Sequence, residues 1–312
     1  MSKQGDTYDG AARLVDIGNG IRMAVRIAGS GPTIVLEPAG AGQGLGGWGE
    51  LDKRLAEFAT VITYDRLGVG ASEPTLRRYP TPTEHANNLA ALLDRLPVQQ
   101  PVIIAGWSMG GLMAQQFAAL YPQKVSAMLL MDPTILVTNN MAGSRWQVWL
   151  MRLVVLGYSR WQAAKMKKVW GKHDEMHRYA TKMMEQFGPR YPREQFLGKI
   201  GEGSLHAMLL SNRWLERLMM NLVDDGAETA RTVAEHGLPK VPLLVLLSTY
   251  FGKKVTSNNA KLEKKFADYA ATTKQLGGEV RMLAEISHQI PMEAPDECVQ
   301  AARDLIARVA AK

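Results

Sequence analysis

The chain has 312 residues, a length that suits one large α/β domain carrying an insertion. Its apolar fraction of 46% provides for a sizeable core, and no apolar run approaches the roughly 18 residues needed to cross a bilayer, so we expect no integral membrane segment. The net charge of +7 is compatible with nucleic acid or an anionic surface as a partner, but the sequence has no long run of like charge and no nucleic-acid-binding motif, which argues against nucleic acid.

The one cysteine, Cys298, excludes an intrachain disulfide and fits a reducing compartment. The first residues, MSKQGDTYDGAAR, are polar and lack the apolar stretch of a secretory signal. We therefore expect a cytoplasmic protein.

In the first half of the chain, strand-like and helix-like runs alternate. Residues 13–27 alternate in polarity around a Gly-Asn-Gly turn at 18–20, which predicts a β-hairpin. Thr83 is expected to cap a helix that runs to about residue 96 with apolar residues on one face. The other expected strands cover 33–36, 60–64, 101–105 and 125–131, and the other expected helices 48–58 and 112–120. Strands and helices that alternate at this spacing predict an α/β fold with a doubly wound, mostly parallel sheet.

The alternation stops after Asp132 and Pro133. Residues 134–236 contain no convincing strand and carry Met, Trp, Arg and Lys at helical spacing. The strand signal returns at 241–247 and is followed by a helix at 260–276, a strand at 279–283 and a last helix at 296–310. The simplest interpretation is a split α/β core with a helical insertion after one of its strands.

The strongest local motif is GWSMG at residues 106–110, which directly follows an expected strand and matches G-x-S-x-G. A serine on a tight strand-to-helix turn has a strained backbone and needs small neighbours on both sides. Such a turn exposes Oγ at the carboxyl end of the sheet and leaves the amide of Met109 at a helix N-terminus, where it can bind an oxyanion. Ser108 is therefore the candidate nucleophile, and an ordinary surface turn is the alternative.

Three motifs, in this order, resemble the α/β-hydrolase fold family: YDRLGVGAS, GWSMGG and SHQIPMEAPD, the last of which is similar to the family's histidine loop, GHxxxxExP. The resemblance covers about 25–132 and the chain from 241 to the end. It implies an α/β-hydrolase core formed by 1–133 and 240–312, with a helical cap, or lid, formed by 134–239. It also implies an esterase- or lipase-like serine hydrolase.

A serine hydroxyl is a weak nucleophile at neutral pH, so a base must accept its proton. The resemblance and the position both select His288, which lies in the loop between the last expected strand and the last expected helix. A surface or packing role is expected for the other five histidines, His85, His173, His177, His206 and His236. No HExxH or clustered ligand pattern indicates a metal, and we expect no cofactor.

The histidine in turn needs a carboxylate that holds the correct imidazole tautomer. In most members of the resembled family this acid follows the strand that here reads LLVLL, but the loop after that strand, STYFGKKVTSNN, contains no carboxylate. The next acids, Glu263 and Asp268, lie in an expected helix. Asp132 ends the strand AMLLMD, and some members of the fold carry their acid at this strand end. We therefore predict Asp132 as the acid, with an Asp-Pro turn that has no such role as the alternative.

The second oxyanion donor is expected in the loop after the first parallel strand. Relatives often have His-Gly there, whereas this chain has EPAGAG at 37–42. We predict that the amide of Ala41 acts as the donor beside that of Met109, with Ala39 as the next choice. A flexible loop is the alternative, and a phosphate-binding loop does not fit because no helix begins immediately after these glycines.

These residues together predict a serine hydrolase that acts on an ester or a similar acyl compound with an apolar portion. Trp and Met side chains of the insertion would line an apolar pocket, although helices packing on one another and on the core explain the same residues, and a basic amphipathic surface is a third interpretation. Amide, lactone or carbon–carbon bond hydrolysis and cofactor-free perhydrolysis stay open as alternatives, as does a non-hydrolytic ligand receptor on the same fold. Neither the substrate's identity nor the oligomeric state follows from the sequence.

Overall fold

The computed structural model describes residues 11–40, 44–74, 80–134, 157, 212–249 and 260–311. Within these ranges eight strands form one sheet in the order β1-β2-β4-β3-β5-β6-β7-β8. The β2 strand pairs antiparallel with both β1 and β4, and every other pairing is parallel. The strands are β1 (Arg13–Asp16), β2 (Arg22–Ala28), β3 (Thr33–Glu37), β4 (Thr60–Tyr64), β5 (Val102–Trp107), β6 (Val125–Met131), β7 (Leu243–Ser248) and β8 (Glu279–Leu283).

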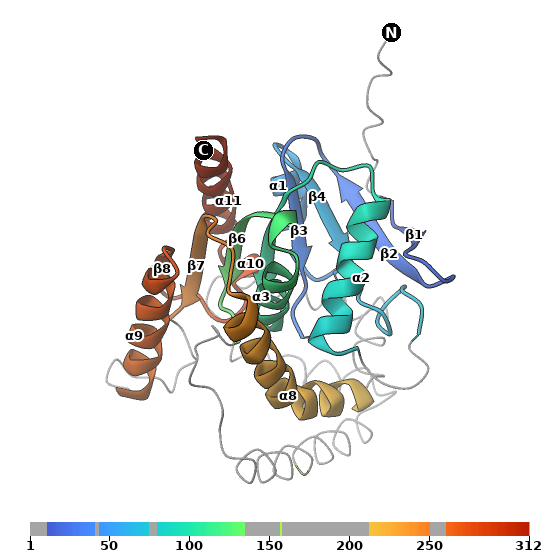
Figure 1. The fold of residues 1–312 in the computed structure, drawn as a ribbon. Coiled ribbons are helices and arrows are strands. Elements are labelled where there is room, and N and C mark those ends of the chain that lie inside the picture. Colours follow the sequence, from blue (N-terminus) through green and yellow to red (C-terminus); the bar gives the residue numbers. More distant parts are fainter. Residues whose placement is uncertain are drawn as a thin grey trace, which may run out of the picture.

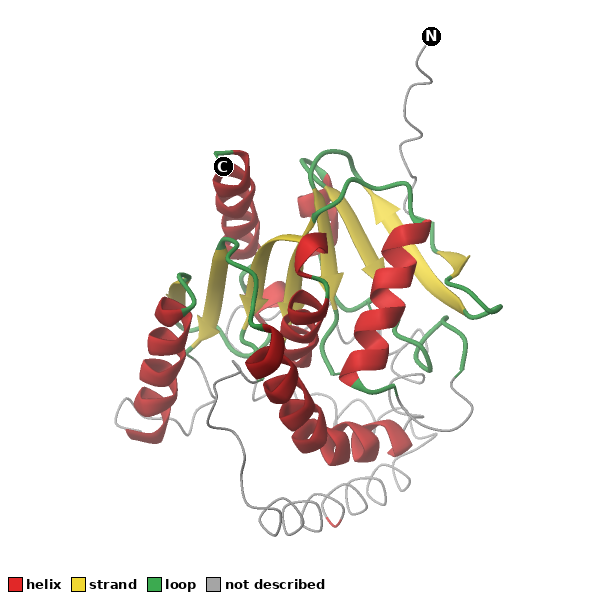
Figure 2. Ribbon diagram, in the orientation of Figure 1, coloured by secondary structure: helices red, strands yellow, loops and turns green. Residues whose placement is uncertain are grey.

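Helices cover both faces of this sheet. The described helices are α1 (Leu51–Ala56), α2 (Pro82–Arg95), α3 (Met109–Leu120), the 3-10 helix η1 (Pro122–Lys124), α8 (Asn212–His236), α9 (Ala260–Gln275), α10 (Ile290–Glu293) and α11 (Pro295–Ala310). Helices α2 and α3 lie on one face and α1 and α11 on the other, while α8 packs on α2 and α3 (Figures 1 and 2). This doubly wound arrangement confirms the predicted fold class.

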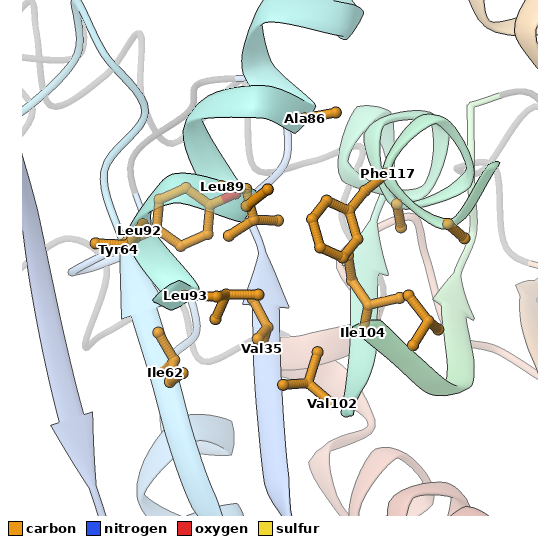
Figure 3. Close-up of a cluster of buried hydrophobic side chains, with 14 of the residues drawn as sticks. Val35, Ile62, Tyr64, Ala86, Leu89, Leu92, Leu93, Val102, Ile104 and Phe117 are labelled. Carbon is orange, nitrogen blue, oxygen red and sulfur yellow. The ribbon is translucent and has the colours of Figure 1, made fainter. Parts of the chain in front are cut away.

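The core is divided by the sheet into two apolar layers. Val35 of β3 belongs to the layer beneath α2 and α3, whereas its neighbours Ile34 and Leu36 belong to the layer beneath α1 and α11. Figure 3 shows Val35 and Ile104 in the first layer, with Phe117 of α3 packed above the sheet. A parallel strand that is covered on both faces buries all its side chains, which explains why β3 and β5 read as continuous apolar runs instead of alternating ones.

The strands and helices expected from the sequence are present in the described ranges, with small shifts at their ends. The expected cap of α2 is wrong: Thr81, not Thr83, caps this helix. The Thr81 hydroxyl accepts from the amide of Glu84, the Glu84 carboxylate accepts from the amide of Thr81, and Pro82 occupies the first turn. This reciprocal capping box satisfies two amides at once, which a cap at Thr83 would not.

Helix α3 begins at Met109, not at residue 112, because the turn at Ser108 leads directly into it. The short helix α10 was not expected from the sequence. It lies between His288 and α11, in the loop that carries the candidate base.

Of the predicted insertion 134–239, the described residues are its first, Gly157 and 212–239, and the Trp- and Met-rich part lies outside them. The carboxylate of Glu228 in α8 accepts from the amide of Thr83 at 3.0 Å and from its hydroxyl at 2.6 Å. These bonds attach α8 to α2 of the core. The division into core and cap stays a prediction. Within the ranges given above, no helix is both long and apolar enough to span a membrane.

The glycines after Ser108 provide a test of how tightly α3 approaches the sheet. A Cβ at Gly110 would lie 2.2 Å from the carbonyl oxygen of Glu37 and 2.6 Å from that of Pro38. Helix propensity alone would favour alanine by about 1 kcal/mol. Because backbone atoms cannot rotate away, we expect the clash to dominate and Gly110→Ala to lower the free energy of unfolding by about 1–3 kcal/mol, measured by urea denaturation.

Gly46→Ala is the matched control, since Gly46 is exposed and a Cβ there has no heavy atom within 4 Å. We expect its stability to stay within about 0.5 kcal/mol of wild type. Equal stability of the two variants would contradict the close approach of α3 to the end of β3.

Candidate active site

Ser108 lies at the junction of β5 and α3 with a strained backbone. Its φ of 56° and ψ of −120° fall in a region that non-glycine residues rarely adopt. The amide of Ser108 donates to the carbonyl of Met131 at 2.9 Å, and its own carbonyl accepts from the amide of Gly111 at 2.9 Å. A Cβ at Gly106 would lie 2.4 Å from the carbonyl oxygen of Gly110. The tight turn therefore depends on glycine on both sides of the serine.

His288 lies in the loop between β8 and α10, and its side chain is 46% exposed. Its Nε2 lies 2.8 Å from Ser108 Oγ. Two contacts fix this loop: the indole Nε1–H of Trp107 donates to the His288 carbonyl at 2.8 Å, and the buried Glu293 carboxylate accepts from the amide of Ser287 at 2.9 Å and from its hydroxyl at 2.5 Å. These bonds fix the backbone that carries the imidazole beside Ser108.

Asp132 follows β6 and is 3% exposed. Its Oδ2 lies 2.5 Å from His288 Nδ1 and accepts a hydrogen bond from Ser248 Oγ at 2.7 Å. Its amide donates to the carbonyl of Leu246 at 2.7 Å. The structure therefore brings Ser108, His288 and Asp132 together in a continuous hydrogen-bonded series, in the geometry that their predicted roles require. Those roles stay predictions.

Of the two candidate oxyanion donors, Met109 lies within the described residues and Ala41 does not. The Met109 amide is the first of α3, and such amides have no partner within the helix, so they are free to point at an anion. Ala41 lies outside the described residues. For the second choice, Ala39, the structure describes the carbonyl, which accepts from Arg66 at 3.1 Å.

A buried charged cluster lies at the end of β3, next to the described residues 38–40. Its members are Glu37, Tyr64, Arg66 and His85, all with less than a tenth of their surface exposed. Arg66 Nε lies 2.9 Å and His85 Nε2 3.0 Å from Glu37 Oε1, and the Tyr64 hydroxyl bonds Oε2. Burial by itself raises the pKa of Glu37, but the charges of His85 and Arg66 and hydrogen bonds from His85 and Tyr64 outweigh it and lower the pKa to about 2.

The adjacent residues Asp65 and Arg66 contact the loop after β3 on both sides of its undescribed part. Arg66 donates to the carbonyls of Pro38 and Ala39, and Asp65 Oδ1 accepts from the amides of Gly44 at 2.8 Å and Leu45 at 3.1 Å. The YDRLGVGAS motif thus has a physical role here, since its acid and its cation together fix the backbone that flanks Ala41.

Thr134 is a further polar residue at the site. Its Oγ1 lies 3.4 Å from Ser108 Oγ, and its amide donates to the Ser108 carbonyl at 3.0 Å. The Tyr269 hydroxyl of α9 donates to the carbonyl of Pro133 at 2.9 Å, which fixes the chain leaving β6.

Sequence reasoning missed several of these contacts. Ser248 and Thr134 lie in none of the three family-like motifs, whereas Trp107, Arg66 and Glu293 lie inside them at positions to which the motifs assign no role. Among the other histidines, His85 is buried in the Glu37 cluster, as a packing role predicts, and His236 is exposed at the end of α8. His173, His177 and His206 lie outside the described residues. In the part of the chain that the structure describes, no group of three or more His, Cys, Asp or Glu residues is arranged to hold a metal ion.

A family model described as alpha/beta hydrolase fold matches residues 32–197. An uncharacterised protein of Mycobacterium tuberculosis is 40% identical over 114 residues, which cover 36% of this chain and 33% of that protein. A pimeloyl–acyl-carrier-protein methyl ester esterase of Pseudoalteromonas atlantica is 32% identical over 123 residues, which cover 39% of this chain and 45% of the esterase. The chain therefore matches less than half the length of either relative.

Likeness to solved structures extends over nearly the whole chain. The structure of a thermophilic esterase from Thermogutta terrifontis has a TM-score of 0.57 and 18% identity to this chain, and covers 96% of it and 99% of the esterase. At that identity the likeness shows the fold alone.

The low pKa of Glu37 leads to a pH-dependent prediction. Because the folded-state pKa, about 2, lies below the ordinary 4.5, ionised Glu37 stabilises the fold above pH 4.5, and this contribution is lost as the pH falls from there towards 2. We expect Glu37→Gln to lower the free energy of unfolding at pH 7 by about 3 kcal/mol or more, because Arg66 is left buried without its carboxylate, and to lose less stability than wild type between pH 5 and pH 3.

Urea denaturation at a series of pH values measures both effects. Glu50→Gln is the control, since Glu50 forms an exposed pair with Lys53, and a change below about 1 kcal/mol is expected. A Glu37→Gln variant whose stability ran parallel to wild type at every pH would contradict the assignment of Glu37 as the anion of the cluster.

Proposed function

Because the chain belongs to the alpha/beta hydrolase fold family, we propose that it is a serine hydrolase that cleaves a carboxylic ester or a related acyl compound with an apolar portion. The observation that carries the proposal is the series of hydrogen-bonding distances from Ser108 Oγ to His288 Nε2, 2.8 Å, and from His288 Nδ1 to Asp132 Oδ2, 2.5 Å. A strained serine in contact with an oriented imidazole is the arrangement that activates a hydroxyl for acyl transfer.

Each group has one role in the proposed reaction. Ser108 Oγ attacks the carbonyl carbon while His288 Nε2 accepts its proton, and Asp132 holds the Nδ1–H tautomer and stabilises the imidazolium. The Met109 amide, together with a loop amide that we assign to Ala41, stabilises the oxyanion. His288 then gives its proton to the leaving alcohol, and the acyl group stays on Ser108. Water attacks this acyl group with His288 again as the base, which releases the acid and restores the serine.

Three considerations favour acyl chemistry with an apolar substrate. The nucleophile is a serine, whereas a dehalogenase-type displacement would need a carboxylate at position 108. The partly exposed Trp107 ring lies 6.1 Å from the His288 ring and offers an apolar surface beside the base. One of the relatives with a stated activity is a methyl ester esterase, and we extend ester hydrolysis to this chain as part of the proposal. The single cysteine, Cys298, favours the cytoplasm as its location.

Covalent labelling separates this proposal from a ligand receptor on the same fold. We expect a fluorophosphonate probe to add one phosphonyl group to the folded protein, because His288 activates Ser108 and the probe mimics the tetrahedral intermediate. Peptide mass mapping should place the label on Ser108, and both Ser108→Ala and the urea-unfolded wild type should stay unlabelled. A folded wild-type protein that does not react would favour the receptor.

A p-nitrophenyl ester series of increasing acyl length tests the assignment of the acid. We expect Asp132→Asn to lower kcat by about 10⁴-fold on every ester that the wild type cleaves, because the amide favours the wrong imidazole tautomer. Asp296→Asn is the control. Asp296 lies on α11, is exposed and pairs with Arg54, so this variant should keep wild-type kcat. Full activity of Asp132→Asn would refute the assignment of the acid.

A further inference from the structure

Ser248 occupies the strand end at which most of the resembled family carries its acid. It is the last residue of β7 and is fully buried. Its Oγ lies 2.7 Å from Asp132 Oδ2, the same oxygen that faces His288 Nδ1 at 2.5 Å. A carboxylate oxygen only accepts, so the hydroxyl must be the donor of this bond. The end of β7 thus supplies a hydrogen-bond donor to the acid of the neighbouring strand.

We propose that Ser248 is a positioning residue for the base: its hydroxyl holds the Asp132 carboxylate in the orientation that directs Oδ2 at His288 Nδ1. Its effect on catalysis rests on the proposed function, whereas its effect on the imidazole does not. Ser248 does not touch the reacting atoms, so it acts through Asp132 alone.

The bond from Ser248 restricts a rotation of the Asp132 carboxylate that the Asp132 backbone leaves free. The Asp132 backbone is already fixed, because its amide donates to Leu246 and its φ is 42°. The torsion about Cβ–Cγ of an aspartate is broad, so a fixed backbone does not by itself orient the carboxylate plane. A charge-assisted bond from a buried hydroxyl on the adjacent strand limits that rotation. A rotated carboxylate would lengthen the bond to the imidazole and allow the other tautomer.

The next residue, Thr249, also has a hydroxyl, but that hydroxyl bonds a different partner. Thr249 Oγ1 donates to the carbonyl of Leu283 on β8 at 2.9 Å and does not reach Asp132. Removing that hydroxyl therefore deletes a comparable hydrogen bond on the adjacent residue without altering the acid. This makes Thr249→Val a matched control for Ser248→Ala.

Two readouts test the proposal on the whole 312-residue chain. The first is kcat and KM on the p-nitrophenyl ester that the wild type cleaves fastest. We expect Ser248→Ala to lower kcat by about 10- to 100-fold, the range for losing one hydrogen bond to a charged group, with KM within about twofold of wild type. Ser248→Thr, which keeps the hydroxyl, and Thr249→Val should both stay within about threefold of wild-type kcat.

The second readout needs no substrate. In the free protein with ¹⁵N-labelled histidine, the Nδ1 proton of His288 should give a downfield resonance, assigned by its loss in His288→Gln. We expect that resonance to shift or broaden into solvent exchange in Ser248→Ala and to persist in Ser248→Thr and Thr249→Val, with folding checked by circular dichroism.

The outcomes separate this inference from the proposed function. If Ser248→Ala keeps both wild-type kcat and the Nδ1 resonance, Ser248 is not a positioning residue, while labelling of Ser108 would still support a hydrolase. If Ser108 does not react with the fluorophosphonate, the proposed function fails, and the resonance in Ser248→Ala and Ser248→Thr alone decides the role of Ser248. Loss of the resonance in Thr249→Val as well as in Ser248→Ala would also overturn the proposal, because the effect would then be general to this strand end.

Discussion

The strained backbone of Ser108 is the constraint on which the rest of the site depends. A φ of 56° lets the chain turn from β5 into α3 within one residue, so that Oγ projects from the carboxyl edge of the sheet and the Met109 amide becomes the first of a helix. The same turn requires α3 to approach β3 closely, which Gly110 permits. The strain is maintained because the buried strand β5 and the buried helix α3 fix the two ends of the turn.

Two of the buried carboxylates near this edge, Glu37 and Asp132, are satisfied in different ways. Glu37 is enclosed by Arg66, His85 and Tyr64, so its charge is compensated inside the core and it serves the backbone of the neighbouring loop. Asp132 is bonded to His288, whose side chain is nearly half exposed. A carboxylate that is enclosed by charged and polar groups supports structure, whereas one bonded to a partly exposed imidazole is placed for the proton transfer proposed above.

Much of the fold could be predicted because parallel strands read as apolar runs and the helices between them carry one apolar face. The helix cap at Thr81 was missed because Thr83 also fits the residue preference of a cap, and only the reciprocal bonds with Glu84 distinguish them. Ser108 and His288 were selected because each lies in a recognisable motif, and Asp132 because the usual position of the acid is empty.

The remaining contacts of the site could not be found from the sequence. Ser248 meets Asp132 across 116 positions of the chain, and Trp107 meets His288 across 181. Such pairs depend on the register of β5, β6, β7 and β8 in the sheet, which no local pattern encodes. The sequence shows that no acid follows β7. It does not show that the Ser248 hydroxyl at the end of this strand bonds Asp132, because that contact depends on how β6 and β7 pair.

The proposed reaction requires Ser108 to attack with His288 as its base and Asp132 as the acid of that base. The most direct measurement is a crystal structure of the protein after reaction with an alkyl p-nitrophenyl phosphonate. The proposed reaction predicts a covalent bond from Ser108 Oγ to phosphorus, the phosphonyl oxygen within hydrogen-bond distance of the Met109 amide, and Asp132 Oδ2 shared by His288 Nδ1 and Ser248. An unmodified Ser108, or a different carboxylate at His288 Nδ1, would contradict it.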